Sequence, residues 1–358
     1  MNNLSIEESK PVAVIFAGGG GTRLWPISTS SLPKQINPAF SKKTLLKEAF
    51  ERALKLFPKE RIVVVATKEL EKKVRDIVKL PKKNFIIQPK NADTAMAMCL
   101  TALHLETLFS NSTAIIFYSD HKITKCNNFK KSINDLVEIA KKHSSLVTIG
   151  TWPTVPSTQF GYIKLGKRAG VKNLYKVKAF REKPDLKTAK RYLKDKKHVW
   201  NTGVYAWKSS VFLSVLKKVA PSFYSDLVEL KISIGEKQYE KKVVDWFEQK
   251  RPASFEKIVS EKLSDMFVYV ADYSWNDIGN WKTIYDLAKK DKNGNAIINR
   301  EDDQKINLVS SSNNTILSES KKIALVGIKD LIIVQNNDSL LICNRNKIDD
   351  IKKITKKF

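Results

Sequence analysis

Four consecutive glycines, Gly18 to Gly21, stand directly behind the apolar stretch VAVIFA, and two cations, Arg23 and Lys34, follow them closely. Glycine has no side chain, so backbone N–H groups in such a loop can approach a ligand. Arg and Lys beside the loop supply positive charge. The residue types and their spacing therefore predict a loop that holds the phosphates of a nucleoside triphosphate.

The glycine run differs from both common phosphate-binding motifs. GxxxxGK[ST] requires Lys directly after its last glycine, and GxGxxG requires a glycine at the position of Leu24. A flexible turn is the alternative interpretation of any glycine run. A plain turn does not require the additional Arg23, Pro26, Pro33 and Lys34, so we favour a binding loop.

Alternating apolar patterns in the first half of the chain predict the elements that position this loop. Strands are expected at residues 12–17, 61–67, 84–88, 113–118 and 145–150, and helices at 44–56, 69–78, 93–109 and 129–143. This alternation predicts an α/β fold with a parallel sheet wrapped on both faces. The glycine loop would then lie at the carboxyl end of the first strand, where such sheets open a ligand crevice.

The pattern changes from about residue 161, where strand-like segments mix with helices. Strands are expected at GYIKLG, YKVKAF, NTGVYAW and MFVYV, and helices at 186–194, within 209–257 and at 280–289. This half is expected to form the second wall of the crevice. Beyond the polar stretch 291–295, which we interpret as a linker, short β-rich pieces recur at even spacing. They predict a small stacked β unit, so we expect domains at 1–290 and 291–358.

Composition limits the function classes. The formal charge is +27, but most cations are lysines spread along the chain, and no nucleic-acid-binding motif is present. We therefore favour a solvated lysine-rich surface, which also attracts polyanionic substrates, over a nucleic-acid-binding protein. The three cysteines lack metal-ligand or disulfide spacing, and no run approaches the roughly 20 apolar residues of a membrane span. We expect a cytoplasmic protein without membrane or nucleic-acid partners.

The run GGGGTRLWPIS, followed by PKQ, resembles the signature of the sugar-nucleotide pyrophosphorylases, G-x-G-T-R-L-x-P and then P-K. The Trp in RLWP and the Gln in PKQ most resemble the mannose-1-phosphate guanylyltransferases. The resemblance implies a Rossmann-like nucleotidyltransferase domain with a mostly parallel mixed sheet, followed by a C-terminal left-handed β-helix-like domain. It also implies that GTP and mannose 1-phosphate react to GDP-mannose and pyrophosphate. We expect no isomerase domain like that of the bifunctional members.

Two aspartates match the metal ligands of the family. Asp120 in YSDHKI resembles the family's D-H segment, and Asp277 in WNDIGNW resembles W-x-D-x-G-x-W. Each Asp is also typical of a turn. Mg²⁺ prefers oxygen ligands and keeps several waters, so two converging carboxylates suffice. We expect Mg²⁺ as cofactor, and we expect these two carboxylates to lie close enough to share one ion. His121 is assigned no role.

The resemblance also implies which residues bind the two substrates. FREKPD resembles the family's E-K-P element, WNTG resembles W-N-S-G, and the Gly-Tyr of TQFGYI resembles its G-Y element; each alone is also typical of a plain turn. The residues implied to bind nucleotide are Gly18, Gly19, Gly20, Gly21, Thr22, Arg23, Gln88 and Thr94, and those implied to bind the sugar phosphate are Gly161, Glu182, Lys183 and Asn201. Arg23 and Lys34 would neutralise the triphosphate and the departing pyrophosphate.

The segment QPKNADTAM departs from the family pattern E-P-x-x-R-N-T-A-P-A. Gln88 replaces Glu, Ala92 replaces Arg, Asp93 replaces Asn and Met96 replaces Pro. Gln88 offers both a donor and an acceptor to a base edge, as a Q-P pair does in related thymidylyltransferases. The usual Arg shortly after WPIS is also absent. The choice of base is therefore the part of the resemblance that the sequence supports least.

Three alternatives stay open. The first is the same chemistry with another base or sugar 1-phosphate. The second is a non-catalytic, nucleotide-sensing paralogue, which would bind nucleotide without releasing pyrophosphate. The third is nucleic-acid binding, which would collapse with salt and survive mutation of Arg23. A homodimer is an assembly that the sequence permits.

Overall fold

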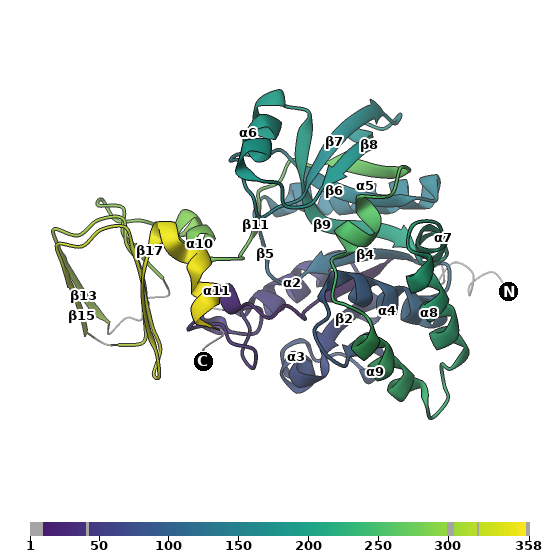
Figure 1. Ribbon diagram of the computed structural model, residues 1–358, viewed down its shortest axis with the longest axis horizontal. Helices are drawn as coiled ribbons and strands as arrows, with labels where there is room; N and C mark the ends of the chain where they lie inside the picture. The colour runs from purple at the N-terminus through teal and green to yellow at the C-terminus, as the bar shows by residue number, and fades with distance from the viewer. Residues whose placement is uncertain (1–9, 41–42, 299–303, 321, 356–358) are drawn as a thin grey trace.

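The computed structural model describes residues 10–40, 43–298, 304–320 and 322–355. The outer ends of the two predicted domains, 1–9 and 356–358, lie outside these residues. A large α/β part and a small β unit lie at opposite ends of the molecule, with helices α10 (Trp281–Leu287) and α11 (Ile351–Ile354) between them (Figure 1).

One mixed sheet of nine strands, in the order β3-β2-β1-β4-β9-β6-β10-β8-β7, forms the centre of the large part. Its strands are β1 (Val12–Phe16), β2 (Ile62–Thr67), β3 (Phe85–Gln88), β4 (Thr113–Tyr118), β6 (Leu146–Thr151), β7 (Tyr162–Arg168), β8 (Leu174–Arg181), β9 (His198–Lys208) and β10 (Met266–Val270). β3, β2, β1 and β4 run parallel to one another, as predicted. β9 pairs antiparallel with both β4 and β6 and so separates them. The sequence did not predict this insertion, because a strand from a distant segment leaves no mark on local periodicity.

Helices cover both faces of this sheet. They are α2 (Leu45–Leu54), α3 (Glu71–Val78), α4 (Asp93–Leu108), α5 (Cys126–His143), α6 (Leu186–Asp195), α7 (Ser209–Val219), α8 (Pro221–Ile232) and α9 (Tyr239–Gln249). Successive side chains of a strand point to opposite faces, so Val14 joins a core with α4 and α7 to α9, whereas Ile15 joins a core with α2, α3 and α5. Burial on both faces explains why the parallel strands are apolar throughout. Within the described residues, no helix has the length and apolar character needed to cross a membrane.

The C-terminal unit is a small stack of strands, which confirms the predicted β-helix-like architecture. β12 (Ala296–Ile297), β14 (Thr315–Ser318) and β16 (Leu331–Gln335) run parallel, β13 (Lys305–Val309) and β15 (Lys322–Val326) form a second parallel pair, and β17 (Leu340–Asn344) closes the stack antiparallel to β16. Asn314 donates to Asn295 Oδ1 at 3.0 Å and so joins successive turns. The predicted linker is a tight turn in which Asp291 accepts backbone hydrogen bonds at 2.8 Å.

A third core joins this unit to the segment after the glycine loop. Leu24 and Ile27 are buried together with Trp281 of α10, Leu341 of β17 and Ile351 of α11. Asn336 Nδ2 also donates to Pro26 O at 3.2 Å. The segment after the glycine loop and the last described helix are thus packed against one another.

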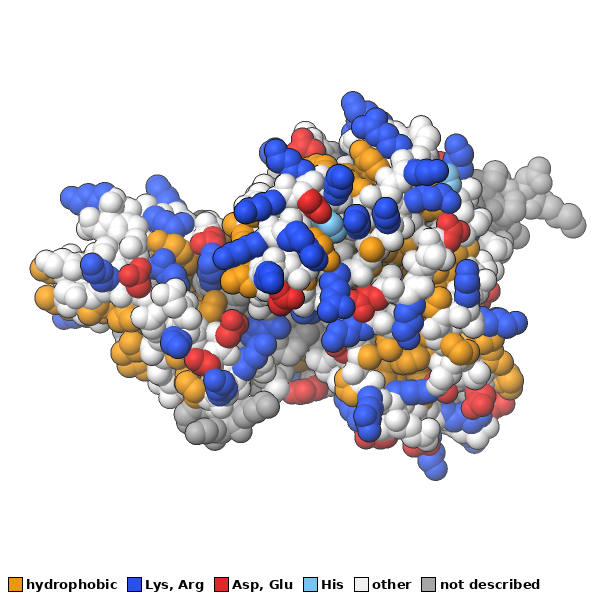
Figure 2. Space-filling model, turned by 45° about the horizontal axis from the view of Figure 1, so that its top comes forward, with side chains coloured by type: hydrophobic (Ala, Val, Ile, Leu, Met, Phe, Trp, Pro, Cys, Tyr) orange, Lys and Arg blue, Asp and Glu red, His pale blue; other side chains and the backbone are white. Residues whose placement is uncertain are grey.

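Basic side chains are spread over both parts of the molecule rather than gathered in one stripe, as Figure 2 shows for one face. This distribution matches the solvated lysine-rich surface that the sequence favours.

Candidate active site

The glycine loop is held in shape by its own segment. Gln35 Nε2 donates to Ala17 O at 3.0 Å and to Gly19 O at 2.8 Å. Gly21 has φ +59°, and a Cβ there would collide with Ser28 Oγ and lie 3.1 Å from the Lys34 backbone N. Only glycine fits this position without strain. The close packing around Gly21 therefore fixes the position of the Lys34 backbone relative to the glycine loop.

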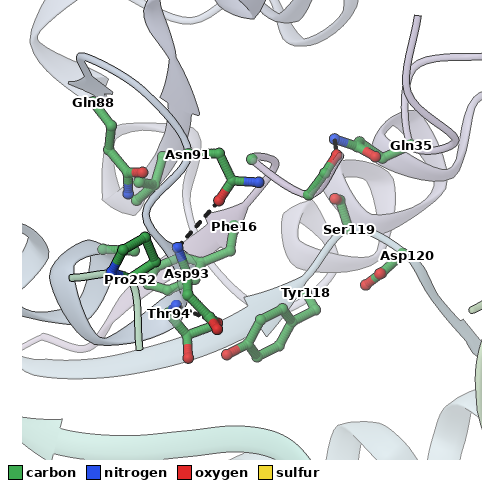
Figure 3. Close-up of a pocket in the computed structure, with 14 residues that line it drawn as sticks. Phe16, Gln35, Gln88, Asn91, Asp93, Thr94, Tyr118, Ser119, Asp120 and Pro252 are labelled. Carbon is green, nitrogen blue, oxygen red and sulfur yellow. Dashed lines mark hydrogen bonds between the residues drawn. The ribbon is translucent and has the colours of Figure 1, made fainter. Parts of the chain in front are cut away.

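A cavity of about 430 Å³ opens at the carboxyl ends of β1 and β4. Gly18, Gly19, Gln88, Thr94 and Asp120 line it, which brings five of the predicted site residues together. In Figure 3, Gln88 lies at one end of the cavity and Asp120 at the other. The volume falls within the range of ordinary small-molecule sites. The cavity thus has room for a ligand with one end near the Gln88 amide and the other near the Asp120 carboxylate.

Three charged side chains converge beside the cavity. Lys34 Nζ lies 2.7 Å from Asp120 Oδ2 and 3.3 Å from Asp277 Oδ1. It also donates to Ile278 O at 2.7 Å. Because both oxygens contact one nitrogen, they are no more than about 6 Å apart. The geometric prediction that these two carboxylates lie close together is confirmed.

A small two-stranded sheet produces this convergence. Asp120 lies in the turn between β4 and β5 (His121–Ile123), and Asp277 ends β11 (Trp275–Asp277). The two short strands pair antiparallel, with Asp277 opposite His121, and Ile278 N donates to Asp120 O at 3.2 Å. Backbone pairing therefore joins two aspartates that are far apart in the sequence.

The charges of this cluster support one another. Burial would lower the pKa of Lys34, but Asp120 and Asp277 outweigh it and raise that pKa above its ordinary value. Burial would likewise raise the pKa of Asp120, but Lys34 outweighs it and lowers that pKa. Burial lowers the pKa of His121, so its ring is neutral near pH 7. The cluster is a cation between two carboxylates, and the lowered pKa keeps Asp120 ionised.

Arg23 lies in the short helix η1 (Thr22–Leu24), close to this cluster. A Cβ on Gly279 would lie 3.2 Å from Asp277 Oδ2 and 3.7 Å from Arg23 Nη1, so both groups flank Gly279. The Arg23 side chain makes no hydrogen bond or ion pair with any other residue that the structure describes. It is a cation available to a ligand.

Not every residue of the predicted loop reaches the cavity. Gly20, Gly21 and Thr22 are outside its lining. A Cβ on Gly20 would face Asn91 Nδ2 at 3.9 Å, and Thr22 is exposed. Gly21 acts on the backbone of the loop, as described above. Any contact of these three residues with nucleotide stays a prediction.

The predicted sugar-phosphate residues form a second group. A Cβ on Gly161 would lie 2.6 Å from Glu182 Oε2, so the absence of a side chain at Gly161 makes room for that carboxylate. The Glu182 side chain is 7% exposed and pairs with Lys183 Nζ at 2.8 Å, whereas the Lys183 side chain is 49% exposed. Asn201 N donates to Gly161 O at 2.9 Å. These four residues are therefore brought together.

Asn201 differs from its predicted role in one respect. Its Oδ1 accepts from Thr148 Oγ1 at 2.9 Å, and its Nδ2 donates to Tyr205 OH at 3.1 Å. The side chain is buried and its amide already has protein partners. In this structure Asn201 holds the sheet together around Gly161, and direct contact with a sugar stays a prediction.

A buried carboxyl that the sequence did not reveal links the two groups. Glu256 begins the π-helix η6 (Glu256–Ser260), lies 3.4 Å from Tyr205 OH and accepts from Thr94 Oγ1 at 3.5 Å. Burial, reinforced by the charge of Glu182, raises the pKa of Glu256 to about 7. Such a group is a candidate for binding hydroxyls. No local motif distinguished it, because its position depends on a packed, irregular segment.

Other cavity residues were also missed. Asn91, Asp93, Tyr118, Ser119 and Pro252 line the cavity (Figure 3). Ser119 adjoins Asp120, and Asn91 and Asp93 lie in the divergent segment after Gln88, so proximity to predicted residues was a usable signal. Pro252 had none, since it comes from the connection after α9.

The donor set fits Mg²⁺ held jointly with a ligand. Among the described residues, no three His, Cys, Asp or Glu side chains are placed to hold a metal ion. Asp120 and Asp277 converge, and Mg²⁺ is often bound through one or two carboxylates together with substrate phosphates and water. Carboxylate oxygens are also the hard ligands that this ion prefers.

Comparisons with known proteins agree with this arrangement. Residues 12–294 match the family model described as nucleotidyl transferase, and residues 304–358 match the MannoseP isomerase/GMP-like beta-helix domain. The mannose-1-phosphate guanylyltransferase of Escherichia coli is 31% identical over 354 residues, covering 96% of this chain and 74% of that protein. A mannose-1-phosphate guanylyltransferase of Salmonella montevideo is 30% identical over 361 residues, covering 96% and 73%. The crystal structure of mannose-1-phosphate geranyltransferase from Thermus thermophilus has a TM-score of 0.85 at 25% identity, covering 97% of this chain and 99% of that one.

Proposed function

Because the chain belongs to the nucleotidyl transferase family, we propose that it forms GDP-mannose and pyrophosphate from GTP and mannose 1-phosphate. An oxygen of the sugar phosphate forms a bond to the α-phosphorus of GTP, in line with the bond to the β-phosphate that breaks, and pyrophosphate leaves. The reaction needs no protein nucleophile. The chain's part is to position the substrates and to neutralise charge.

The observation that carries this proposal is the placement of Lys34 between Asp120 and Asp277, beside the cavity that Gly18 and Gly19 line. A polyphosphate lying along the loop has backbone N–H groups on one side and the cations Arg23 and Lys34 beside it. These donors are fixed before the ligand arrives, because Gln35 and Ser28 hold the loop. Preorganised donors of this kind stabilise charge that develops on the leaving group.

We further propose that Asp120 and Asp277 hold Mg²⁺. When bound, such an ion neutralises charge on phosphate oxygens. The chain prepares these ligands itself, since Lys34 lowers the pKa of Asp120 despite burial and keeps that carboxylate ionised. On the sugar side, Glu182 and Lys183 offer an acceptor for hydroxyls and a cation for the sugar phosphate.

The second candidate function is the same reaction with a nucleoside triphosphate that carries another base. The position of Gln88 is the observation that favours it. Its side chain lines the far end of the cavity from Asp120 and is 4% exposed. A Gln amide donates and accepts, whereas the Glu of the family pattern only accepts when ionised. Transfer of a thymidylyl or uridylyl group would use the same remaining residues.

One assay separates these possibilities. Pyrophosphate release is measured with Mg²⁺ across four nucleoside triphosphates and several sugar 1-phosphates. The proposal expects GTP with mannose 1-phosphate to be the fastest pair. A faster pair with another base would replace the substrate assignment, and absence of release with every pair would favour the nucleotide-sensing alternative. A homodimer and a cytoplasmic location stay predictions.

A further inference from the structure

The last helix of the described chain packs against the glycine loop. Ile351 of α11 is 1% exposed in the core that also holds Leu24 of η1. The next residue, Lys352, is exposed. Because Ile351 anchors the helix, Lys352 stands on an element that packs against η1, the segment of Arg23.

Three cations from distant segments influence one another there. Arg23 comes from the glycine loop, Lys183 from the segment FREKPD and Lys352 from the C-terminal unit. Arg23 is the strongest influence that lowers the pKa of Lys352, ahead of burial, and Lys183 adds to it. Burial and, more weakly, Arg23 oppose the charge on Lys183, but Glu182 and Glu256 outweigh them and raise the pKa of Lys183. The three cations therefore lie within electrostatic range of one another.

Acidic groups offset only part of this charge. Glu182 pairs with Lys183, and Glu256 also favours the charge on that residue. Asp277 flanks Gly279 together with Arg23, and Asp349 partly offsets Lys352. Within the part of the chain that the structure describes, neither the Arg23 side chain nor that of Lys352 forms a hydrogen bond or ion pair. Converging cations without protein partners are stabilised by a polyanion, since charge-assisted contacts to phosphate oxygens are strong.

We propose that Lys352 is a polyphosphate-binding residue that the C-terminal unit contributes to the active site, where it contacts the phosphate chain of the nucleoside triphosphate together with Arg23. The proposal rests on the proposed function for its substrate. It gives the β-helix-like unit a part in substrate binding in addition to packing. The packing of α11 against η1, which carries Arg23, favours the triphosphate over the sugar phosphate as the group that Lys352 contacts.

The test compares Lys352→Ala with Lys353→Ala in the full chain. Lys353 is the next residue of the same helix and is also exposed, but its Nζ pairs with Asp350 at 2.6 Å. We expect Lys352→Ala to raise the KM for the triphosphate about 5- to 10-fold, the effect of losing one partly solvated charged contact. The KM for the sugar 1-phosphate should stay within about twofold, as should both constants for Lys353→Ala. Lys352→Arg keeps the charge and should restore the wild-type constant, which separates binding from folding.

Binding of inorganic pyrophosphate, measured by calorimetry, gives a readout that needs no turnover. Lys352→Ala should weaken it by a similar factor, and the difference should shrink in high salt. If the wild type releases no pyrophosphate with any substrate pair but its pyrophosphate affinity depends on Lys352, the cation site stands and the proposed function fails. Equal affinity for wild type, Lys352→Ala and Lys353→Ala would overturn the inference.

Discussion

Replacing Lys34 by Met removes the cation between Asp120 and Asp277 and keeps an unbranched apolar side chain of similar reach. The two carboxylates then face one another within about 6 Å without a shared partner. Ile278 O also loses its donor. We expect the variant to fold with lower stability and to lose most of its activity.

The size of the effect follows from distance and exposure. Two like charges about 6 Å apart repel by about 3 kcal/mol at an effective dielectric constant near 20. The Lys34 side chain is 9% exposed, but those of Asp120 and Asp277 are 23% and 31% exposed, so solvent reduces this value. A loss of about 2 kcal/mol corresponds to a fall of roughly 3 °C in melting temperature for a chain of this size.

Mg²⁺ should reverse part of this loss. A divalent ion replaces the missing positive charge between the carboxylates, whereas in the wild type it competes with Lys34. The melting temperature is therefore measured in EDTA and in Mg²⁺ for both proteins. We expect the increase caused by Mg²⁺ to be larger in Lys34→Met.

The control is Lys68→Met. Lys68 pairs with Glu71 at 3.0 Å, but its side chain is 74% exposed, so its loss should change stability little. If Lys34→Met and the wild type have the same melting temperature in EDTA, the contacts of Lys34 with Asp120, Asp277 and Ile278 O contribute no stability. An equal Mg²⁺ effect in wild type and variant would contradict the assignment of the two aspartates as ligands.

Three further predictions concern other parts of the site. Asp277→Asn should lower turnover on the order of 10²–10³-fold with an unchanged circular dichroism spectrum, and full activity would exclude Asp277 from the reaction. Gly21→Ala should destabilise the protein by about 2 kcal/mol or more in urea unfolding, because its Cβ collides with Ser28; Gly170→Ala, also at positive φ but with open space around it, should lose only about 1 kcal/mol, and equal losses would show that the collision is unimportant. Glu256 has a folded pKa of about 7 against an ordinary value of 4.5, so its stabilising contribution is present below about pH 4.5 and is lost as the pH rises through about 7. Glu256→Gln should remove up to roughly 3 kcal/mol of that pH dependence, measured by urea unfolding between pH 5 and pH 8, and identical pH profiles would contradict the raised pKa.

Local residue patterns were sufficient to predict the glycine loop at the end of the first strand, because glycines, cations and strand ends are local signals. The two aspartates were predicted from the resemblance to a known family, since each alone is also typical of a turn. Gly161 was predicted as a sugar-phosphate-binding residue, and that role stays a prediction. The structure shows a different reason for glycine at this position, since Glu182 occupies the space that a Cβ would take.

Other features depend on which segments become neighbours. Periodicity shows that β9 is buried but not that it enters between β4 and β6. It also shows Asn201 as a polar residue in a strand without revealing that Thr148 and Tyr205 use its amide. Glu256 was missed for the same reason, because its burial comes from an irregular segment packed against α4 and β9. Tertiary packing determines all three.

The core shared by Leu24, Ile27 and Ile351 has a consequence for how the protein matures during synthesis. Ribosomes release the amino-terminal segment first, and the chain grows at about 5–20 residues per second. Ile351 follows Ile27 by more than 300 residues. The apolar side chains of Leu24 and Ile27 therefore lack this packing partner for roughly 15–65 s after their own synthesis. A nascent chain therefore completes this core only after Ile351 has been synthesised, and a product terminated before that residue lacks the contact.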